Sequence, residues 1–357
     1  MAATRAKLLL IVSLGVVLRL SLRFSSYYGE ISNRVEISSP VNAWERGEWS
    51  DFAIEIISNF SSPLPVVEAV TLLRWKVSPY SGDTFHESPL FLAFYRLLIG
   101  SLSDLQIALF FIAVDVLTAF VLAKVCSAQL NCTVAVERGI EEEEELKKKN
   151  KKTKTKTKKE KDGGDDKDKD EEEDDDDEAT LINLKDPLFS GLFIQPETVS
   201  TSAFWSAAIY LLAPYSILAC VAQSTAVLGN CLVGLTLLAA TSGHRAASLL
   251  LLALLTLNAF YPLILLSPVV LMLEQRWHLD QQQQQQQQGK KKSPKKSEES
   301  SFSSANPMHI ELSSSATRLS IAGSVLLFAL FYGLLMAASY WLEGGSLQFL
   351  QSNYVFM

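Results

Sequence analysis

Three titratable residues, Asp83, His86 and Glu87, lie close together between Pro79 and Pro89. Carboxylates and an imidazole can exchange protons, hold a metal ion or bind a polar ligand. The Ser-Pro, Tyr-Ser-Gly-Asp and Ser-Pro patterns of this stretch are typical of turns, so we expect a loop of restricted conformation. The chain has no G-x-G-x-x-G, phosphate-loop, G-x-S-x-G or H-E-x-x-H motif. The stretch therefore predicts polar contacts with a ligand or partner more than a catalytic centre.

Other carboxylates nearby leave one enzymatic alternative open. Multi-helix glycosyltransferases that use lipid-linked sugars carry an acidic pair in their first luminal loop, as base and metal ligand. Glu45, Glu48 and Asp51 could join Asp83 and Glu87 in such a role. A working pair must converge on one metal ion or hydroxyl group, and this region has no D-x-D motif. Solvated loop charges are the simpler interpretation.

The elements that must position these residues are strongly apolar. The 357 residues are 48% hydrophobic, and the apolar residues are gathered in runs, several of which reach the ~20 residues that a membrane helix needs. Two soluble domains, which the length alone would allow, do not explain such runs. The sequence predicts an all-α fold, namely a polytopic membrane protein with a multi-helix transmembrane core and low-complexity cytosolic inserts.

The apolar runs and the polar stretches between them predict an order of segments. In sequence they are a signal-anchor transmembrane helix (1–24), a luminal loop with an interfacial helix (25–103), a transmembrane helix (104–126), a disordered charged cytosolic insert (127–198), transmembrane helices including a proline-broken segment (199–276), a low-complexity cytosolic loop (277–318), a transmembrane helix (319–342) and a luminal tail (343–357).

Several side chains in the first two segments have an expected position relative to the membrane. Arg19 lies inside the apolar run of the first helix and Arg23 at its end, and we expect both to extend to the far membrane surface. In the interfacial helix we expect Tyr95 and Arg96 at the level of the lipid head groups. Asn59 begins an Asn-Phe-Ser sequon on the luminal side, where it would accept N-glycosylation.

Polar residues inside the apolar runs are candidates for specific contacts. Asp115 lies near the middle of its predicted helix, where a carboxylate is costly unless it is protonated, paired or turned toward protein. It forms either a neutral, hydrogen-bonded helix contact or a contact to a partner subunit or polar ligand. Gln223 and Asn230 would join neighbouring helices or line a cavity. Pro214 must break or kink its helix, and the proline-interrupted run 246–273 suggests two short segments or a re-entrant pair.

Charge is concentrated in one insert. Residues 137–178 hold 20 acidic and 13 basic residues, so this segment accounts for the whole net charge of −7. Blocks of like charge do not bury a core, which predicts disorder. The acids would cancel most of the field of the lysines, so we expect a spacer and no nucleic-acid partner. The four cysteines form no C-x-x-C pair, and we expect neither a metal nor a cofactor.

A set of short motifs, in a fixed order, resembles the PIG-U family, the subunit U of the glycosylphosphatidylinositol (GPI) transamidase. The motifs are R-V-E-I-S-S-P at Arg34–Pro40, Trp44, S-P-Y-S-G-D-T-F-H-E-S-P-L at Ser78–Leu90, D-V-L-T-A at Asp115–Ala119, P-Y-S-I-L-A-C-V-A-Q-S-T at Pro214–Thr225 and Y-P-L at Tyr261–Leu263. The family pattern continues for several membrane helices beyond the point that Met357 matches. We therefore expect its later lipid-contacting residues to have no counterparts here.

The resemblance implies a function and partners. Family members are multi-spanning proteins of the endoplasmic reticulum membrane, with a helical core similar to glycosyltransferase membrane domains. They are non-catalytic subunits that scaffold the transamidase and help present the GPI lipid to its cysteine-protease-like subunit. The resemblance implies that Asp83, His86 and Glu87 face the GPI lipid or a partner subunit, and that Asp115, Gln223 and Asn230 lie in the helical core. The alternatives are a mannosyltransferase that uses a lipid-linked sugar and a transporter.

Overall fold

The computed structural model describes residues 2–32, 65–80, 85, 87–161, 196–291, 315–346 and 348–350. Asn59, Asp83 and His86 lie outside them. The described helices, in chain order, are α1 (Ala2–Arg23), α2 (Tyr28–Ser32), α4 (Pro65–Arg74), α5 (Pro89–Ser101), α6 (Asp104–Lys161), α7 (Pro196–Leu212), α8 (Pro214–Val221), α9 (Thr225–Thr241), α10 (Arg245–Asn258), the 3₁₀ helix η2 (Tyr261–Leu265), α11 (Leu266–Lys291), α12 (Ser315–Leu342) and α13 (Gln348–Leu350).

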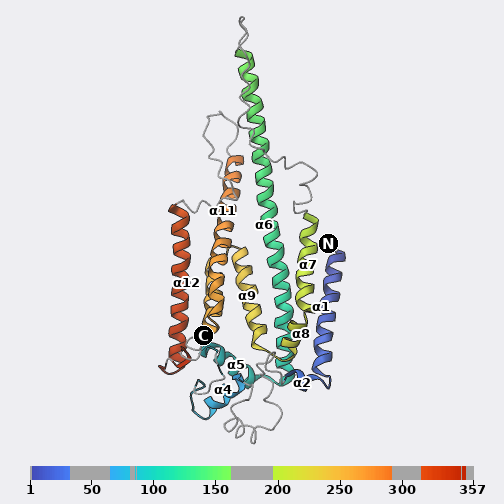
Figure 1. Cartoon of the computed structure of the whole chain (residues 1–357), viewed down its shortest axis with the longest axis vertical. Coiled ribbons are helices and arrows are strands. Elements are labelled where there is room, and N and C mark those ends of the chain that lie inside the picture. Colours follow the sequence, from blue (N-terminus) through green and yellow to red (C-terminus); the bar gives the residue numbers. More distant parts are fainter. Residues whose placement is uncertain are drawn as a thin grey trace, which may run out of the picture.

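The long helices stand side by side with roughly parallel axes (Figure 1). α6 packs against α7 and α9, and α10 packs against α9 and α12. The short helices α2, α4 and α5 gather at the end of this bundle that lies opposite the N-terminus (Figure 1). The predicted loop before α5 therefore lies at one end of the bundle and not along its side.

Within the described residues, two helices are long and apolar enough to cross a membrane, Asp104–Val134 in α6 and Thr317–Leu342 in α12. The pair Thr201–Leu212 and Pro214–Val221 passes the same test only as one bent unit, which raises the number to three. α9 and α10 are apolar but have 17 and 14 residues, fewer than a straight span needs. These helices confirm the expected all-α membrane fold.

Prolines interrupt the chain where the sequence predicts breaks. α7 ends at Leu212 and α8 begins at Pro214, with a bend of 52° between them. Proline has no N–H to donate and its ring clashes with the preceding turn, so one helix ends and another begins there. The run 246–273 is likewise divided, because η2 separates α10 from α11.

Two helices extend farther than we expected. We predicted a disordered insert over 127–198, but α6 continues to Lys161, and α11 continues through the glutamine run to Lys291. Glutamate, lysine and glutamine have high intrinsic helix propensity, so a helix already formed by an apolar run propagates into them. Charge patterning predicted poor burial, and poor burial alone does not exclude a helix.

Apolar side chains hold the bundle together in several clusters. One cluster joins α4, α5, α6, α8 and α9, and its buried members include Phe85, Phe111 and Phe349. A second lies among α9, α10, α11 and α12. Gly234 lets α9 approach α6 closely, since a Cβ atom there would lie 3.1 Å from Cγ1 of Val121.

Candidate functional site

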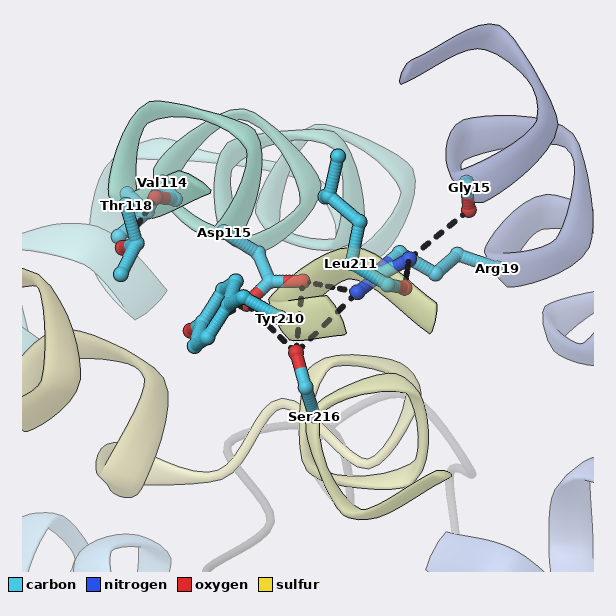
Figure 2. A network of polar contacts seen from close by, with 8 residues as sticks. All are labelled: Gly15, Arg19, Val114, Asp115, Thr118, Tyr210, Leu211 and Ser216. Atoms are coloured by element: carbon cyan, nitrogen blue, oxygen red, sulfur yellow. Dashed lines mark hydrogen bonds and ion pairs between the residues drawn. The ribbon is translucent and has the colours of Figure 1, made fainter. Parts of the chain in front are cut away.

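A buried ion pair between α1 and α6 is the most highly connected polar group of the bundle interior. The guanidinium of Arg19 donates from Nη2 to Oδ2 of Asp115, and both side chains are 0% exposed (Figure 2). Tyr210 donates its hydroxyl proton to the other carboxylate oxygen at 2.7 Å. The Ser216 hydroxyl lies 3.2 Å from that same oxygen and 3.2 Å from Nη2 of Arg19. Four helices, α1, α6, α7 and α8, thus meet at one carboxylate.

The break at Pro214 supplies part of this site. The last carbonyl groups of a helix have no partner within it, and the carbonyl of Leu211 instead accepts a hydrogen bond from Nη1 of Arg19 at 3.0 Å. The same Nη1 donates to the Gly15 carbonyl at 3.0 Å. Gly15 also leaves the space for this contact, because a Cβ atom there would lie 3.3 Å from Nη1.

The ion pair corrects one expectation and decides between two others. Arg19 does not extend to a membrane surface, because its guanidinium is enclosed by protein. One of the two interpretations of Asp115 was a contact between helices, and the structure shows such a contact. An ion pair with Arg19, and not a neutral hydrogen bond alone, offsets the cost of burying the carboxylate. Arg23 pairs with Asp104 at the start of α6, and its guanidinium carbon lies 3.7 Å from the ring centroid of Tyr28.

A second polar contact joins the other side of the bundle. Glu274 of α11 is fully buried and accepts from Arg245 of α10 at 2.7 Å. The hydroxyl of Ser320 in α12 donates to the same oxygen at 2.7 Å. In an apolar interior, each carboxylate needs such donors to offset the loss of hydration. Polar contacts therefore fix both groups of helices, α1, α6, α7 and α8 on one side and α10, α11 and α12 on the other.

The described part of the predicted contact loop packs against the end of the bundle. The Tyr80 hydroxyl donates to the backbone carbonyl of Glu87 at 3.0 Å, and its ring lies 5.6 Å from Phe85 and 6.3 Å from Phe349. The amide N–H of Ser88 contacts the side-chain oxygen of Asn258 at 3.4 Å. These contacts hold Glu87 over the ends of α9 and α10.

Glu87 is in an environment that favours its protonated form. Burial raises its pKa from 4.5 to about 7, and the nearby hydroxyl groups of Thr225 and Tyr95 lower it by less than burial raises it. Among the described residues, Oε2 of Glu87 and the Tyr95 hydroxyl have no hydrogen-bond partner. Tyr95 is itself fully buried, so its side chain packs within the protein, and its expected depth at head-group level stays a prediction. Burial and the nearby Glu87 raise the pKa of the Tyr95 hydroxyl well above 10. A carboxyl group that ionises near neutral pH is a candidate polar contact.

Gln223 and Asn230 lie at and beyond the turn between α8 and α9. Gln223 is fully buried and has a φ of 56°, the left-handed conformation that usually requires glycine. Its N–H bonds to the carbonyl of Cys220, and the next N–H, of Ser224, bonds to that of Ala219. Among the described residues, neither polar atom of the Gln223 amide has a hydrogen-bond partner. Asn230 is partly buried on α9.

Sequence analysis missed Arg19, Tyr210 and Ser216 as parts of the buried site. A signal existed for Arg19, since the apolar runs held one arginine and one aspartate whose charges could neutralise each other. Tyr210 and Ser216 flank the predicted break at Pro214, but their types are ordinary for a membrane helix. In the sequence, Arg19 lies 96 residues from Asp115 and 197 residues from Ser216, so no local pattern joins them.

Comparison with known proteins identifies the family. The family model described as GPI transamidase subunit PIG-U matches residues 49–357. The chain belongs to the PIG-U family. Similar relatives are the GPI-anchor transamidase component PIGU of Homo sapiens and that of Cricetulus griseus, each 30% identical over 276 residues, which are 77% of this chain and 48% of the relative. This PIG-U family chain thus spans about half the length of the curated relatives it matches.

Proposed function

We propose that this PIG-U family chain is a non-catalytic, multi-pass subunit of the GPI transamidase in the endoplasmic reticulum membrane. Its partners are the other subunits, including the cysteine-protease-like catalytic subunit, and the GPI lipid. It scaffolds the complex and helps present the lipid for attachment to protein C-termini. The match of the family over residues 49–357 supports this role.

The observation that supports a scaffold role is that the carboxylate of Asp115 is engaged by side chains of the same chain. Its two carboxylate oxygens accept from Arg19, Tyr210 and Ser216 on three other helices. A general base needs a carboxylate that can reach the proton of a substrate, and a transport path needs polar groups open to a cavity. The most deeply placed acid of α6 instead holds helices together.

The loop before α5 is the region we assign to contacts outside the chain. Glu87 lies at the end of the bundle and ionises near neutral pH, and Asp83 and His86 are its neighbours in sequence. The cationic amine of a GPI lipid, or a polar surface of another subunit, would meet these side chains. We also assign Gln223 and Asn230, polar groups of the helical core, to contacts with the lipid or a partner subunit. We assign Asn59 as the N-glycosylation site.

Complementation tests this proposal. The chain is expressed in cells that lack subunit U, and two quantities are measured: GPI-anchored protein at the cell surface and co-purification with the catalytic subunit. A loop variant carrying Asp83→Asn, His86→Gln and Glu87→Gln keeps side-chain size and should reduce surface anchoring. Asp280→Asn is the matched control, because Asp280 is an exposed carboxylate on α11, with 49% of its side chain accessible.

Each outcome has a defined meaning. Rescue with co-purification supports both the scaffold role and lipid presentation by this part of the family fold. Co-purification without rescue would assign lipid presentation to other parts of the family fold. A well-expressed chain that neither rescues nor co-purifies would contradict the proposal, as would sugar transfer from a dolichol-linked donor that depends on the loop carboxylates.

A further inference from the structure

A cavity of about 780 Å³ lies between α4, α5 and the end of α12. Its size falls within the range of small-molecule sites. The walls come from the end of α4 and the following turn, from one side of α5 and from the residues after α12. They include Leu73, Lys76, Tyr80, Arg96, Leu97 and Glu343.

Two cations line this cavity without a carboxylate partner. In the part of the chain that the structure describes, Lys76 and Arg96 take part in no ion pair, and both are exposed. Among the described residues on the wall, the one acid is Glu343, and neither of its carboxylate oxygens has a hydrogen-bond partner. Burial raises the pKa of this carboxyl, which favours its neutral form. The two cations therefore outweigh the acid and leave a net positive charge for an incoming anion.

The backbone at Lys76 is unfavourable for lysine. Lys76 has a φ of 60° and ends α4: its N–H bonds to the Leu73 carbonyl at 3.2 Å, and the N–H of Val77 bonds to the Leu72 carbonyl at 3.0 Å. This pattern is a Schellman motif, whose left-handed position usually holds glycine.

The same motif ends α8, where Gln223 takes the left-handed position. It also ends α9 and α12, and there that position is glycine. These residues are Gly243, with a φ of 78°, and Gly344, with a φ of 74°. A lysine in place of glycine makes the turn less stable, since its Cβ atom is crowded in this conformation. A strained residue on a cavity wall points to a function for its side chain.

The position of the cavity matches that of lipid head groups. α12 ends at Leu342, immediately before Glu343, and its last turn carries Tyr340 and Trp341, of which Trp341 is 81% exposed. Exposed Tyr and Trp at the end of a membrane helix mark the interface between hydrocarbon and water. Leu97 on the cavity wall is 68% exposed on α5, next to the cations, which offers an apolar surface for an acyl chain.

We propose that this cavity binds the phosphate-bearing head group of a membrane lipid. Lys76 and Arg96 pair with the phosphate, and the acyl chains lie along the apolar surface of α5 and α12. The inference rests on the proposed function in that GPI is itself a phosphate-bearing lipid, and it names a site for this class of lipid. Binding is measured on this chain alone, without any other transamidase subunit, so it can fail or succeed separately from anchoring.

Lipid binding by the purified full chain tests the proposal. The delipidated protein in detergent is titrated with phosphatidylinositol, and bound lipid is counted by native mass spectrometry. Diacylglycerol with the same acyl chains lacks the phosphate, and inositol 1-phosphate lacks the chains. We expect phosphatidylinositol to bind at least about tenfold more tightly than either, as the loss of a charge-assisted hydrogen bond implies.

Variants separate the cation from the backbone. Arg96→Gln and Lys76→Asn should each weaken phosphatidylinositol binding about tenfold, whereas Lys76→Arg should retain it. Lys76→Gly is the most informative variant, because glycine relieves the strained φ: the melting temperature should rise while lipid binding falls. Lys124→Gln is the matched control, since Lys124 is an exposed cation on α6 that does not line the cavity, and it should bind as the wild type does.

Three results would overturn the proposal. Equal affinity for diacylglycerol would show a cavity that binds acyl chains without recognising phosphate. Equal affinity for inositol 1-phosphate would show a site for a free phosphate compound. Wild-type affinity in both Lys76→Gly and Arg96→Gln, with both proteins folded, would show that these cations do not bind the head group.

Discussion

Arg19 and Asp115 should be replaceable together but not singly. Asp115→Leu removes the only carboxylate that the structure places on the Arg19 guanidinium within the described residues, and leaves a cation that is 0% exposed. Arg19→Met leaves the carboxylate with the hydroxyl groups of Tyr210 and Ser216. The double variant restores electrical neutrality with side chains of similar volume.

The size of each effect follows from the burial of the pair. Leaving one buried charge without its partner costs about 3–5 kcal/mol, whereas replacing both with apolar side chains is often close to neutral. Tyr210 and Ser216 lose their acceptor in the double variant, which costs about 1–3 kcal/mol. We expect the double variant to be more stable than either single variant and a coupling free energy of at least about 3 kcal/mol.

The assay is the melting temperature of the detergent-solubilised chain, followed by fluorescence-detected size exclusion. Each single variant should lose roughly 6 °C or more, taking about 2 °C per kcal/mol. Tyr210→Phe provides an internal scale, because it removes one hydrogen bond, worth about 1 kcal/mol. Additive effects, with a coupling below about 1 kcal/mol, would refute the view that the pair is a structural link between α1 and α6.

Three further variants test other parts of the structure. Glu87→Gln removes a carboxyl whose pKa burial raises to about 7; the folded chain prefers its protonated form, so wild-type stability is highest at low pH and falls as the pH rises through 7. The variant should match the wild type near about pH 5 and exceed it by up to roughly 3 kcal/mol above about pH 7, and parallel melting curves over pH would contradict this. Gly234→Leu places a side chain where a Cβ atom alone would lie 3.1 Å from Val121, so α9 must move away from α6 and the melting temperature should fall by an amount equivalent to about 1–3 kcal/mol. Gln223→Gly relieves a φ of 56° and should stabilise the chain by about 1 kcal/mol; loss of surface anchoring in the same variant would show that the amide has an external partner, and normal anchoring would assign it no contact.

The positions of helix breaks could be predicted because their cause is local. Pro214 cannot donate a backbone hydrogen bond, and this alone ends α7 near Leu212. The all-α membrane fold could be predicted for a similar reason, since apolar runs of sufficient length have few alternatives to a helix in lipid.

The lengths of the helices were less predictable than their positions. Composition indicated that the charged insert and the glutamine run bury little surface, and from that we predicted disorder for the insert and a low-complexity loop for the glutamine run. α6 and α11 nevertheless extend to Lys161 and Lys291, because helix propensity acts on the backbone and needs no burial. The hydrophobic pattern predicted that the helices end with the apolar runs, whereas intrinsic helix propensity predicts that they continue. The structure follows the propensity.

The polar contacts inside the bundle could not be predicted from local pattern. Arg19 was expected at a membrane surface because snorkelling is the usual solution for an arginine near a helix end. Its actual partner, Asp115, lies 96 residues away. Which faces of α1 and α6 meet depends on the packing of the whole bundle, including the space that Gly15 leaves. Charge complementarity could have suggested the pair, but not the orientation of the two side chains.

The buried ion pair cannot form until its later members have been synthesised, so the order of synthesis sets a minimum delay before Arg19 is paired. Arg19 leaves the ribosome 96 residues before Asp115 and 197 residues before Ser216. At about 5–20 residues per second, the complete set of partners follows Arg19 by roughly 10–40 s. Until then Arg19, near the end of α1, can extend its guanidinium to a membrane surface. Its burial among α1, α6, α7 and α8 therefore belongs to a late step of assembly, after Ser216 has been synthesised.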